Sequence, residues 1–133
     1  MQPSSFQYDR PLKAILLLII LAVVMMGCIL ALAPPVARDA LIHHLAIPKL
    51  WIKNGGFYEI PWTGFSYYPM NVDLLYLIPL SFGNDIIPNF IHMSFGLGTG
   101  WLIYLYLNKR LGRLEGLLGA AIFISLPIVV RMS

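Results

Sequence analysis

The chain has 133 residues, of which 59% are hydrophobic and 11% are charged, and its mean hydropathy is +0.77. Ordinary soluble domains contain about 25% charged residues, so this composition excludes a typical soluble domain and predicts a membrane protein. The net charge of +3 comes from small basic groups beside apolar runs, which argues against nucleic acid as a partner. The single cysteine, Cys28, excludes an internal disulfide and a cysteine-based zinc site.

Residues 12–33 form the first apolar run, and its 22 residues match the roughly 20 that a membrane-spanning helix requires. Arg10 and Lys13 flank its start, so the positive-inside rule predicts that residues 1–11 lie in the cytoplasm. A cleaved signal peptide is the alternative, because the run ends in "ALA" and its "MMGC" resembles a lipoprotein cleavage box. The run is longer than the apolar core of a signal peptide, and we therefore expect an uncleaved helix.

Residues 34–85 contain prolines, glycines, tryptophans, tyrosines and many of the charges, which predicts a long loop rather than a tight turn. We expect a first interfacial helix in this loop near residues 38–53. In that helix Asp39 and His43 lie one turn apart on the polar face, opposite leucine and isoleucine side chains. Pro48 is expected to end or kink the helix, because the residue before a proline avoids the α conformation.

A second interfacial or re-entrant helix is expected near residues 69–82, beginning close to Pro69. Its apolar part has only about a dozen residues and is interrupted by Asp73 and Pro79, which argues against a span. A crossing there would also place the basic cluster of residues 109–113 outside, against the positive-inside rule. We therefore expect the whole loop on the outer side, with Asp73 in the first helical turn, where the helix dipole favours a carboxylate.

Two further apolar runs, residues 86–107 and 114–130, are each long enough to cross the membrane, and residues 108–113 form a cytoplasmic loop between them. Pro127 is expected to kink or end the last helix. The predicted fold is therefore all-α, with three transmembrane helices and a long extracytoplasmic first loop. The predicted location is the cell's inner membrane.

Asn89 and His92 lie inside the second predicted span, where polar side chains are costly and usually face a protein interior or a cavity. They share a helix face with Gly96, and Gly96 and Gly100 form a small-xxx-small pattern. We expect this face to pack against another helix.

Asp39 is the predicted catalytic base, because a carboxylate just beyond a span can take a proton from a hydroxyl or amine at the lipid surface. The alternative is a structural role, in which Asp39 caps the following helix and pairs with Arg38 or Lys49. His43 and His44 are candidates for phosphate binding, proton transfer or metal ligation. Asp39 with His43 is the better metal-binding pair, so a divalent metal stays open, and His44 alternatively is a solvated interfacial side chain.

An aromatic patch, "WTGFSYYP", occupies residues 62–69, with Trp51 and Phe57 upstream. Tryptophan and tyrosine gather at the headgroup level of membrane proteins, which explains the patch without any ligand. Flat aromatic rings also stack on the faces of sugars, and this second interpretation stays open.

The order of these features resembles the N-terminal part of the GT-C membrane glycosyltransferases. The similarity is greatest to bacterial family 39-like proteins related to protein O-mannosyltransferases and lipid A aminoarabinose transferases. It consists of a span followed directly by an acidic residue, then "GGF", "YPMNVDLLY", "FGND" and "NKRLGRLEG". The resemblance implies transfer of a sugar from a polyprenyl-phosphate carrier, held among membrane lipids, to a glycan, lipid or protein acceptor outside the cytoplasm.

The resemblance also implies roles for single residues. Asp39 matches the family's base, although this sequence has one carboxylate, in "RDA", where the family often has two. The family's proline motif at the start of the second loop helix usually begins "PP", and it reads "YPMNVD" here. Basic side chains would steady the phosphate leaving group while a carboxylate deprotonates the acceptor. The residues expected to contact donor or acceptor are His43, His44, Lys49, Tyr68, Asn71 and Asp73.

Enzymes of this family have many more spans and a further domain, so the resemblance implies that these residues are a fragment that is inactive alone. The alternative function is a small multi-span transport or scaffold subunit without catalysis. A transporter needs ionisable groups near the middle of the membrane. Here Asn89 and His92 are the polar candidates that enter a span, which favours chemistry at the surface.

Overall fold

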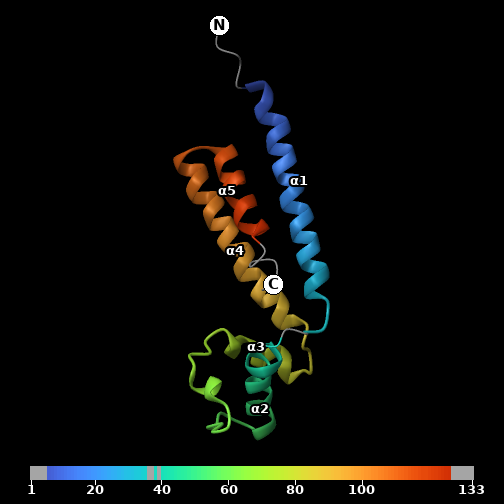
Figure 1. Cartoon of the computed structure of the whole chain (residues 1–133), viewed down its shortest axis with the longest axis vertical. Coiled ribbons are helices and arrows are strands. Elements are labelled where there is room, and N and C mark those ends of the chain that lie inside the picture. The colour runs from blue at the N-terminus through green and yellow to red at the C-terminus, as the bar shows by residue number, and fades with distance from the viewer. Residues whose placement is uncertain (1–5, 36–37, 39, 127–133) are drawn as a thin grey trace. The chain divides into compact units, whose positions relative to one another are not determined.

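The computed structural model describes residues 6–35, 38 and 40–126, and over those residues it confirms the all-α prediction (Figure 1). The described residues also include a π-helix, η1 (Ala40–His44), and a 3-10 helix, η2 (Gly64–Tyr67). The α-helices are α1 (Phe6–Ala31), α2 (Ala46–Asn54), α3 (Asp73–Ser81), α4 (Ile87–Arg110) and α5 (Arg113–Ser125).

The chain divides into two compact units. The long-helix unit contains the described residues of Met1–Leu30 and His92–Ser133, and thus nearly all of α1, most of α4 and the whole of α5. The loop unit contains the described residues of Ala31–Ile91, with η1, α2, η2 and α3. The division separates the apolar helices from the polar segment that the sequence places between them.

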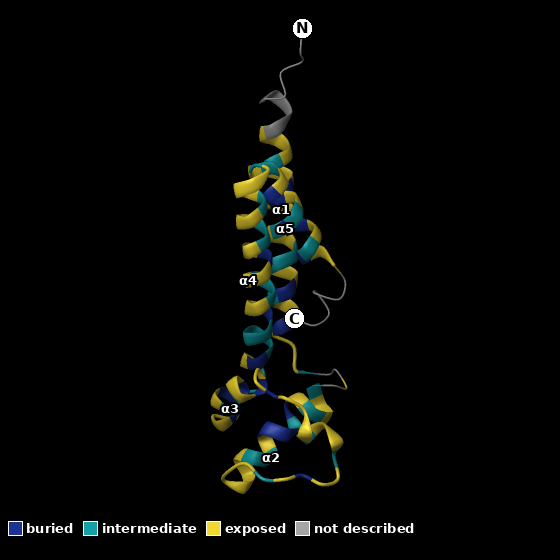
Figure 2. Cartoon of the chain, turned by 90° about the vertical axis from the view of Figure 1, so that its left-hand side faces the viewer, coloured by how far each residue is buried: buried dark blue, intermediate teal, exposed yellow. Residues whose placement is uncertain are grey.

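Helices α1 and α4 contain segments long and apolar enough to cross a membrane, Arg10–Ala31 and Ile87–Arg110. Their 22 and 24 residues correspond to about 33 and 36 Å of helix, against roughly 30 Å of hydrocarbon. Only 17% of the most apolar stretch of α1 and 11% of that of α4 are buried, so neither resembles the core helix of a soluble protein (Figure 2). Because α1 lies near the N-terminus, a signal sequence passes the same test and stays open for this helix.

The predicted third span is described only in part. Helix α5 covers Arg113–Ser125, whereas residues 127–130 of that span lie outside the described residues. Leu126 has an extended backbone, with φ −61° and ψ 129°, which is the conformation that a residue before a proline prefers. This end of α5 agrees with the effect predicted for Pro127, itself outside the described residues.

Glycines allow α4 and α5 to lie side by side (Figure 1). A Cβ atom on Gly116 would lie 3.0 Å from the carbonyl oxygen of Tyr104, and a Cβ atom on Gly100 would lie 3.0 Å from the Ile124 side chain. Both distances are shorter than the roughly 3.5–4.0 Å of an ordinary carbon contact, so these positions favour glycine. The packing role predicted for the small-xxx-small pattern is confirmed at Gly100.

Helix α1 packs through one side on α5. Leu16 of α1 is buried against Leu117 and Ala121 of α5. The partly buried side chains around this cluster are Ile20, Tyr104 and Leu114. Other apolar side chains of α1, such as Leu18 and Leu21, are exposed, so α1 packs on protein through one side.

Two small apolar clusters hold the loop unit together. The first joins the end of η1 to α3 and consists of Leu45, Tyr76 and Leu80. The second joins α2 to the segment that follows it and consists of Ile47, Ile60 and Met70. Since both clusters join residues far apart in the sequence, the predicted loop is a folded unit rather than an irregular connection.

Two helix boundaries differ from the sequence prediction. Pro48 was expected to end or kink a helix, but it is the third residue of α2, where the first turn needs no backbone N–H. The break in the first loop helix lies instead at Leu45, between η1 and α2. Helix α3 begins at Asp73 rather than near Pro69, and Asp73 lies in its first turn as predicted.

Helix α3 ends in a Schellman motif. Gly83 has a positive φ of 72°, which a residue without a side chain adopts at little cost. Its N–H donates to the Leu80 carbonyl at 2.9 Å, and the Asn84 N–H donates to the Pro79 carbonyl at 3.0 Å. This turn fixes the direction in which the chain leaves α3.

Candidate functional site

His44 of η1 and Asp73 of α3 form the central polar contact of the loop unit. His44 Nδ1 lies 3.0 Å from Asp73 Oδ1 and 3.1 Å from Oδ2. The Asp73 side chain is only 6% exposed, whereas that of His44 is 48% exposed. An ionised carboxylate can only accept, so Nδ1 carries the hydrogen and donates it. The contact therefore fixes the orientation of the ring and leaves the other ring nitrogen, Nε2, outside the pair.

Asp73 is the one charged side chain that is buried among the described residues. Burial of a carboxylate is costly unless it is paired, and Asp73 has both His44 and the positive end of the α3 dipole beside it. Burial, and after it the negative charge of Asp73, raises the pKa of the Tyr76 hydroxyl. Tyr76 therefore stays neutral beside the carboxylate at physiological pH.

The π-helix η1 brings two adjacent histidines into contact. The Leu45 N–H donates to the Ala40 carbonyl at 2.9 Å, which is the i to i+5 bond of a π turn. The rings of His43 and His44 lie 3.9 Å apart, and His43 also stacks on Phe65 at 4.6 Å and 13°. Single π turns are rare in proteins overall, and those that occur are often found at functional sites. An aromatic ring thus holds the first histidine and a carboxylate holds the second.

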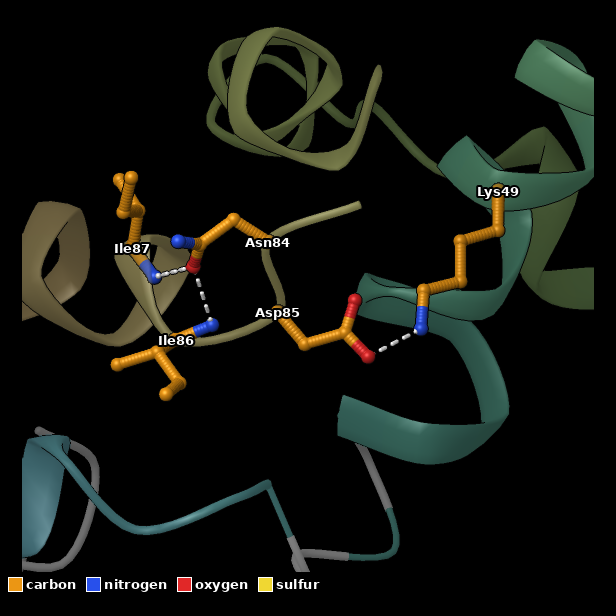
Figure 3. A network of polar contacts seen from close by, with 5 residues as sticks. All are labelled: Lys49, Asn84, Asp85, Ile86 and Ile87. Atoms are coloured by element: carbon orange, nitrogen blue, oxygen red, sulfur yellow. Dashed lines mark hydrogen bonds and ion pairs between the residues drawn. The ribbon is translucent and has the colours of Figure 1, made fainter. Parts of the chain in front are cut away.

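Lys49 of α2 contacts the segment between α3 and α4 (Figure 3). Its Nζ donates to Asp85 Oδ2 at 2.6 Å. The adjacent Asn84 Oδ1 accepts the N–H groups of Ile86 and Ile87, both at 3.0 Å, and so caps the start of α4. The side chains of the ion pair are 47% and 39% exposed, so the pair contributes little free energy and can open.

Asn89 connects the two ends of the loop unit. Its Nδ2 donates to the carbonyl oxygens of Ala31, at 3.1 Å, and Ala33, at 3.3 Å. The last carbonyls of a helix have no partner within that helix, and Asn89 supplies one at the end of α1. Asn89 thus contacts protein, as predicted, and His92 is partly buried.

The aromatic patch is partly folded into the loop unit. Phe65 meets Tyr68 edge-on at 5.7 Å. The Tyr67 hydroxyl donates a hydrogen bond to Glu59, which raises the pKa of Tyr67. Trp62, Tyr67 and Tyr68 remain exposed, so both predicted roles, a headgroup belt and a sugar-stacking surface, stay open.

Asp39, the predicted base, lies outside the described residues. Its predicted pairing with His43 therefore stays a prediction, and so does its alternative role as a cap that pairs with Arg38 or Lys49. The described partner of Lys49 is Asp85.

The remaining predicted site residues divide into two groups. His44 and Asp73 are brought together, so His44 is a half-exposed paired side chain rather than the simple solvated one that was the alternative. Tyr68 and Asn71 are exposed. The loop unit thus unites two of the substrate-binding candidates in one contact.

This arrangement can perform two kinds of chemistry. An imidazole whose Nδ1 donates to a carboxylate can accept a proton at Nε2, or, when protonated, donate a hydrogen bond there to an anion. The Lys49 ammonium has three donors and uses one on Asp85, so it can also bind a phosphate oxygen.

Among the described residues, no three or more His, Cys, Asp or Glu side chains gather closely enough to hold a metal ion. Asp39, the predicted metal partner of His43, is outside this part of the chain. The divalent metal left open by the sequence therefore stays an untested prediction.

Sequence reasoning missed two acidic partners, Asp85 and Glu59. Asp85 follows Asn84 in "FGND", where Gly-Asn before an apolar run is a turn and helix-start signal. That signal identifies the cap on α4 but not the partner of Lys49, 36 residues earlier. Glu59 and Tyr67 lie on opposite sides of a turn that no local pattern indicates.

No family model, no curated protein and no solved structure matches this chain. The resemblance to the GT-C glycosyltransferases therefore depends on the sequence features alone. The function has to be argued from the geometry of the loop unit.

Proposed function

We propose that the protein is an integral membrane glycosyltransferase of the GT-C type, or a part of one, that moves a sugar from a polyprenyl-phosphate carrier to an extracytoplasmic acceptor. One observation carries the proposal. The segment between two helices able to cross a membrane folds into a unit in which two carboxylates each hold a nitrogen-bearing side chain, in the pairs His44–Asp73 and Lys49–Asp85. A substrate with a polar head and a lipid tail requires polar groups beside apolar helices.

The donor side of the reaction needs positive charge. When the sugar leaves, its phosphate gains negative charge, which positioned cationic donors stabilise. Lys49 and His44 are both about half exposed, and each can add a hydrogen bond to a phosphate oxygen. Their carboxylate partners hold them in place before the donor binds.

The acceptor side needs a group that removes a proton from the attacking hydroxyl or amine. The resemblance gives this role to Asp39. In the sequence, Asp39 comes eight residues after the end of α1, immediately before η1 and four residues before His43, which supports this role. The exposed rings of Trp62 and Tyr68 supply flat surfaces for a sugar in the same unit.

The test uses the natural gene product in membrane vesicles, with a panel of radiolabelled sugars on undecaprenyl phosphate as donors. We expect transfer of one label, and we expect Asp39→Asn to reduce turnover by about 10²- to 10⁴-fold, the usual contribution of a general base. Binding of undecaprenyl phosphate, measured by tryptophan fluorescence, should be unchanged in that variant. Glu59→Gln is the control, since its exposed carboxylate has no proposed role.

The proposal fails if no donor in the panel is consumed, or if Asp39→Asn turns over as fast as the unchanged protein. The 133-residue chain alone is expected to be inactive, as the resemblance implies. Turnover by that chain would contradict this expectation while supporting the transferase.

A scaffold or transport subunit is the second candidate, and one observation favours it. Lys49 and His44 already have carboxylate partners, which is what a purely structural unit would show. A binding assay with undecaprenyl phosphate distinguishes the two candidate functions, because a scaffold should show no saturable binding of this lipid. Lys49→Ala should weaken binding by several-fold for a transferase and leave a scaffold unaffected.

A further inference from the structure

Helix α3 exposes an apolar face, with the exposed Ser81 at its edge. Leu74, Ile78 and Phe82 follow one another at four-residue intervals and therefore lie along one side of the helix, with Leu75 beside them. Leu74 and Leu75 are each 43% exposed, Ile78 is 65% exposed and Phe82, directly after the helix, is 85% exposed. In Figure 2, α3 accordingly carries exposed as well as buried residues.

The opposite face of α3 is turned into the loop unit. It contains Asp73, which holds His44, and the buried Tyr76 and Leu80, which pack against Leu45. A helix on the surface of a soluble protein has its charged residues outside and its apolar residues inside. In α3 the only charged residue faces the interior of the loop unit, and the outward face is apolar. Exposure of that outward face to water is therefore unfavourable.

The short connection between α3 and α4 indicates which apolar surroundings lie near the exposed face of α3. Phe82 lies five residues before Ile87, where the second candidate span begins, and five residues reach at most about 18 Å. The Gly83 turn and the Asn84 cap fill this short link. Asn89 binds the end of α1, the other candidate span, within the same unit. The exposed face therefore ends within about 18 Å of the first residue of the second candidate span.

We propose that α3 lies flat on the membrane surface, with Leu74, Leu75, Ile78 and Phe82 embedded at the boundary between lipid headgroups and acyl chains. This decides between the re-entrant and interfacial alternatives and assigns the face that enters the lipid. The Asp73–His44 contact, on the opposite face, then stays on the aqueous side. The inference does not depend on the proposed transferase activity.

The test measures the depth of single positions in a bilayer. The chain is reconstituted in vesicles of phosphatidylethanolamine and phosphatidylglycerol, with Cys28→Ser to remove the native thiol. A nitroxide label is attached at Ile78→Cys, at Phe82→Cys, or at Lys53→Cys on the exposed side of α2 as control. Collisions with oxygen, which concentrates in lipid, are compared with collisions with a water-soluble nickel chelate.

Labels at positions 78 and 82 are expected to collide several-fold more with oxygen than with nickel, and the label at position 53 should show the reverse. Preferential nickel collisions at 78 and 82 would mean that the face is in water and would overturn the proposal. Protection from both reagents would mean that protein covers the face, which also overturns it. Dipolar broadening between labels would then identify a second copy of the chain as the cover.

A second measurement does not require a label on α3. Ile78→Asn removes an exposed apolar side chain without touching the buried face, so the fold should be kept. Its circular dichroism should match that of the unchanged chain, while quenching of tryptophan by lipids brominated near the headgroup should decrease. Equal quenching in both proteins would contradict the proposed insertion.

Discussion

The two units of this protein use opposite means to hold helices together. In the long-helix unit the helices approach through glycine, as at Gly100 and Gly116, and leave large apolar side chains on the outside. In the loop unit the elements are joined by directed polar contacts, His44 to Asp73 and Lys49 to Asp85, around two small apolar clusters.

This difference is the one that the proposed locations would produce, with the long-helix unit in lipid and the loop unit in contact with water. Between helices in lipid there is no hydrophobic driving force, so close van der Waals contact through small residues must supply the attraction. In contact with water, apolar clusters and paired polar groups supply it instead. The most discriminating experiments remove a glycine contact or a polar pair from one unit and leave the other unit unchanged.

The largest effect is expected at the glycine contact of the long-helix unit. Gly116→Val would force a side chain against the Tyr104 carbonyl, and such overpacking typically costs about 1–3 kcal/mol. Thermal unfolding in detergent micelles, followed by circular dichroism, measures the loss. Gly98→Val is the matched control, because open space surrounds a Cβ atom there. Equal losses in the two variants would show that the contact at Gly116 is not responsible, since valine has a higher helix propensity than glycine.

Removal of the buried carboxylate should affect the loop unit next most strongly. Asp73→Ala removes a charge-assisted hydrogen bond, and since the remaining His44 is half exposed and can be hydrated, we expect a loss of about 1–2 kcal/mol. Hydrogen exchange should show faster exchange in α3 and unchanged exchange in α5. Asp85→Ala, which removes the exposed pair with Lys49, should cost at most about 1 kcal/mol. If both variants behave alike, burial of Asp73 does not strengthen its pair.

A smaller effect is expected at the start of α4. Asn84→Ala removes the side-chain oxygen that accepts the Ile86 and Ile87 N–H groups, and loss of such a cap costs about 1 kcal/mol. Hydrogen exchange at the start of α4 should accelerate while the rest of that helix is unaffected. The exposed Asn71→Ala serves as control. Protection at Ile86 and Ile87 that survives Asn84→Ala would refute the cap.

The smallest expected effect is a shift in the pKa of Tyr67. Because Tyr67 donates a hydrogen bond to Glu59, the pKa of Tyr67 lies above the ordinary value of about 10. A raised pKa favours the protonated phenol in the folded state, so this stabilisation is present below pH 10 and is lost as the pH rises through the folded pKa. In an ultraviolet titration, with Tyr67→Phe subtracted to isolate the signal, Glu59→Ala should move the midpoint down. An unmoved midpoint would exclude the hydrogen bond as the cause.

The apolar helices were the predictable part of the fold. An apolar run needs no partner to identify it, so the predicted spans 12–33 and 86–107 lie almost wholly within α1 and α4. Gly100 was recognisable for the same reason, since the spacing of small residues along one helix is a local pattern. Where helices begin was less predictable, and Pro48 shows why: a proline ends a helix or starts one depending on which residues precede it.

The candidate site was predictable in its composition but not in its pairing. The sequence identified His44, Lys49 and Asp73 as chemically capable residues, but the partners are separated by 29 and 36 residues. A single sequence contains no signal for such long-range contacts. The π turn that aligns the two histidines ends at Leu45, which packs on Tyr76 and Leu80, and helical periodicity does not indicate it.

The Asn89 amide has a consequence for how the chain is made. It reaches back 58 residues to the carbonyl of Ala31, so the end of α1 has left the ribosome long before its partner is synthesised. Until Asn89 has been synthesised, this contact between the two ends of the loop unit cannot form. The contact that joins the two ends of the loop unit forms only after the first turn of α4 has been synthesised. Completion of the loop unit therefore follows translation of the start of the second apolar helix.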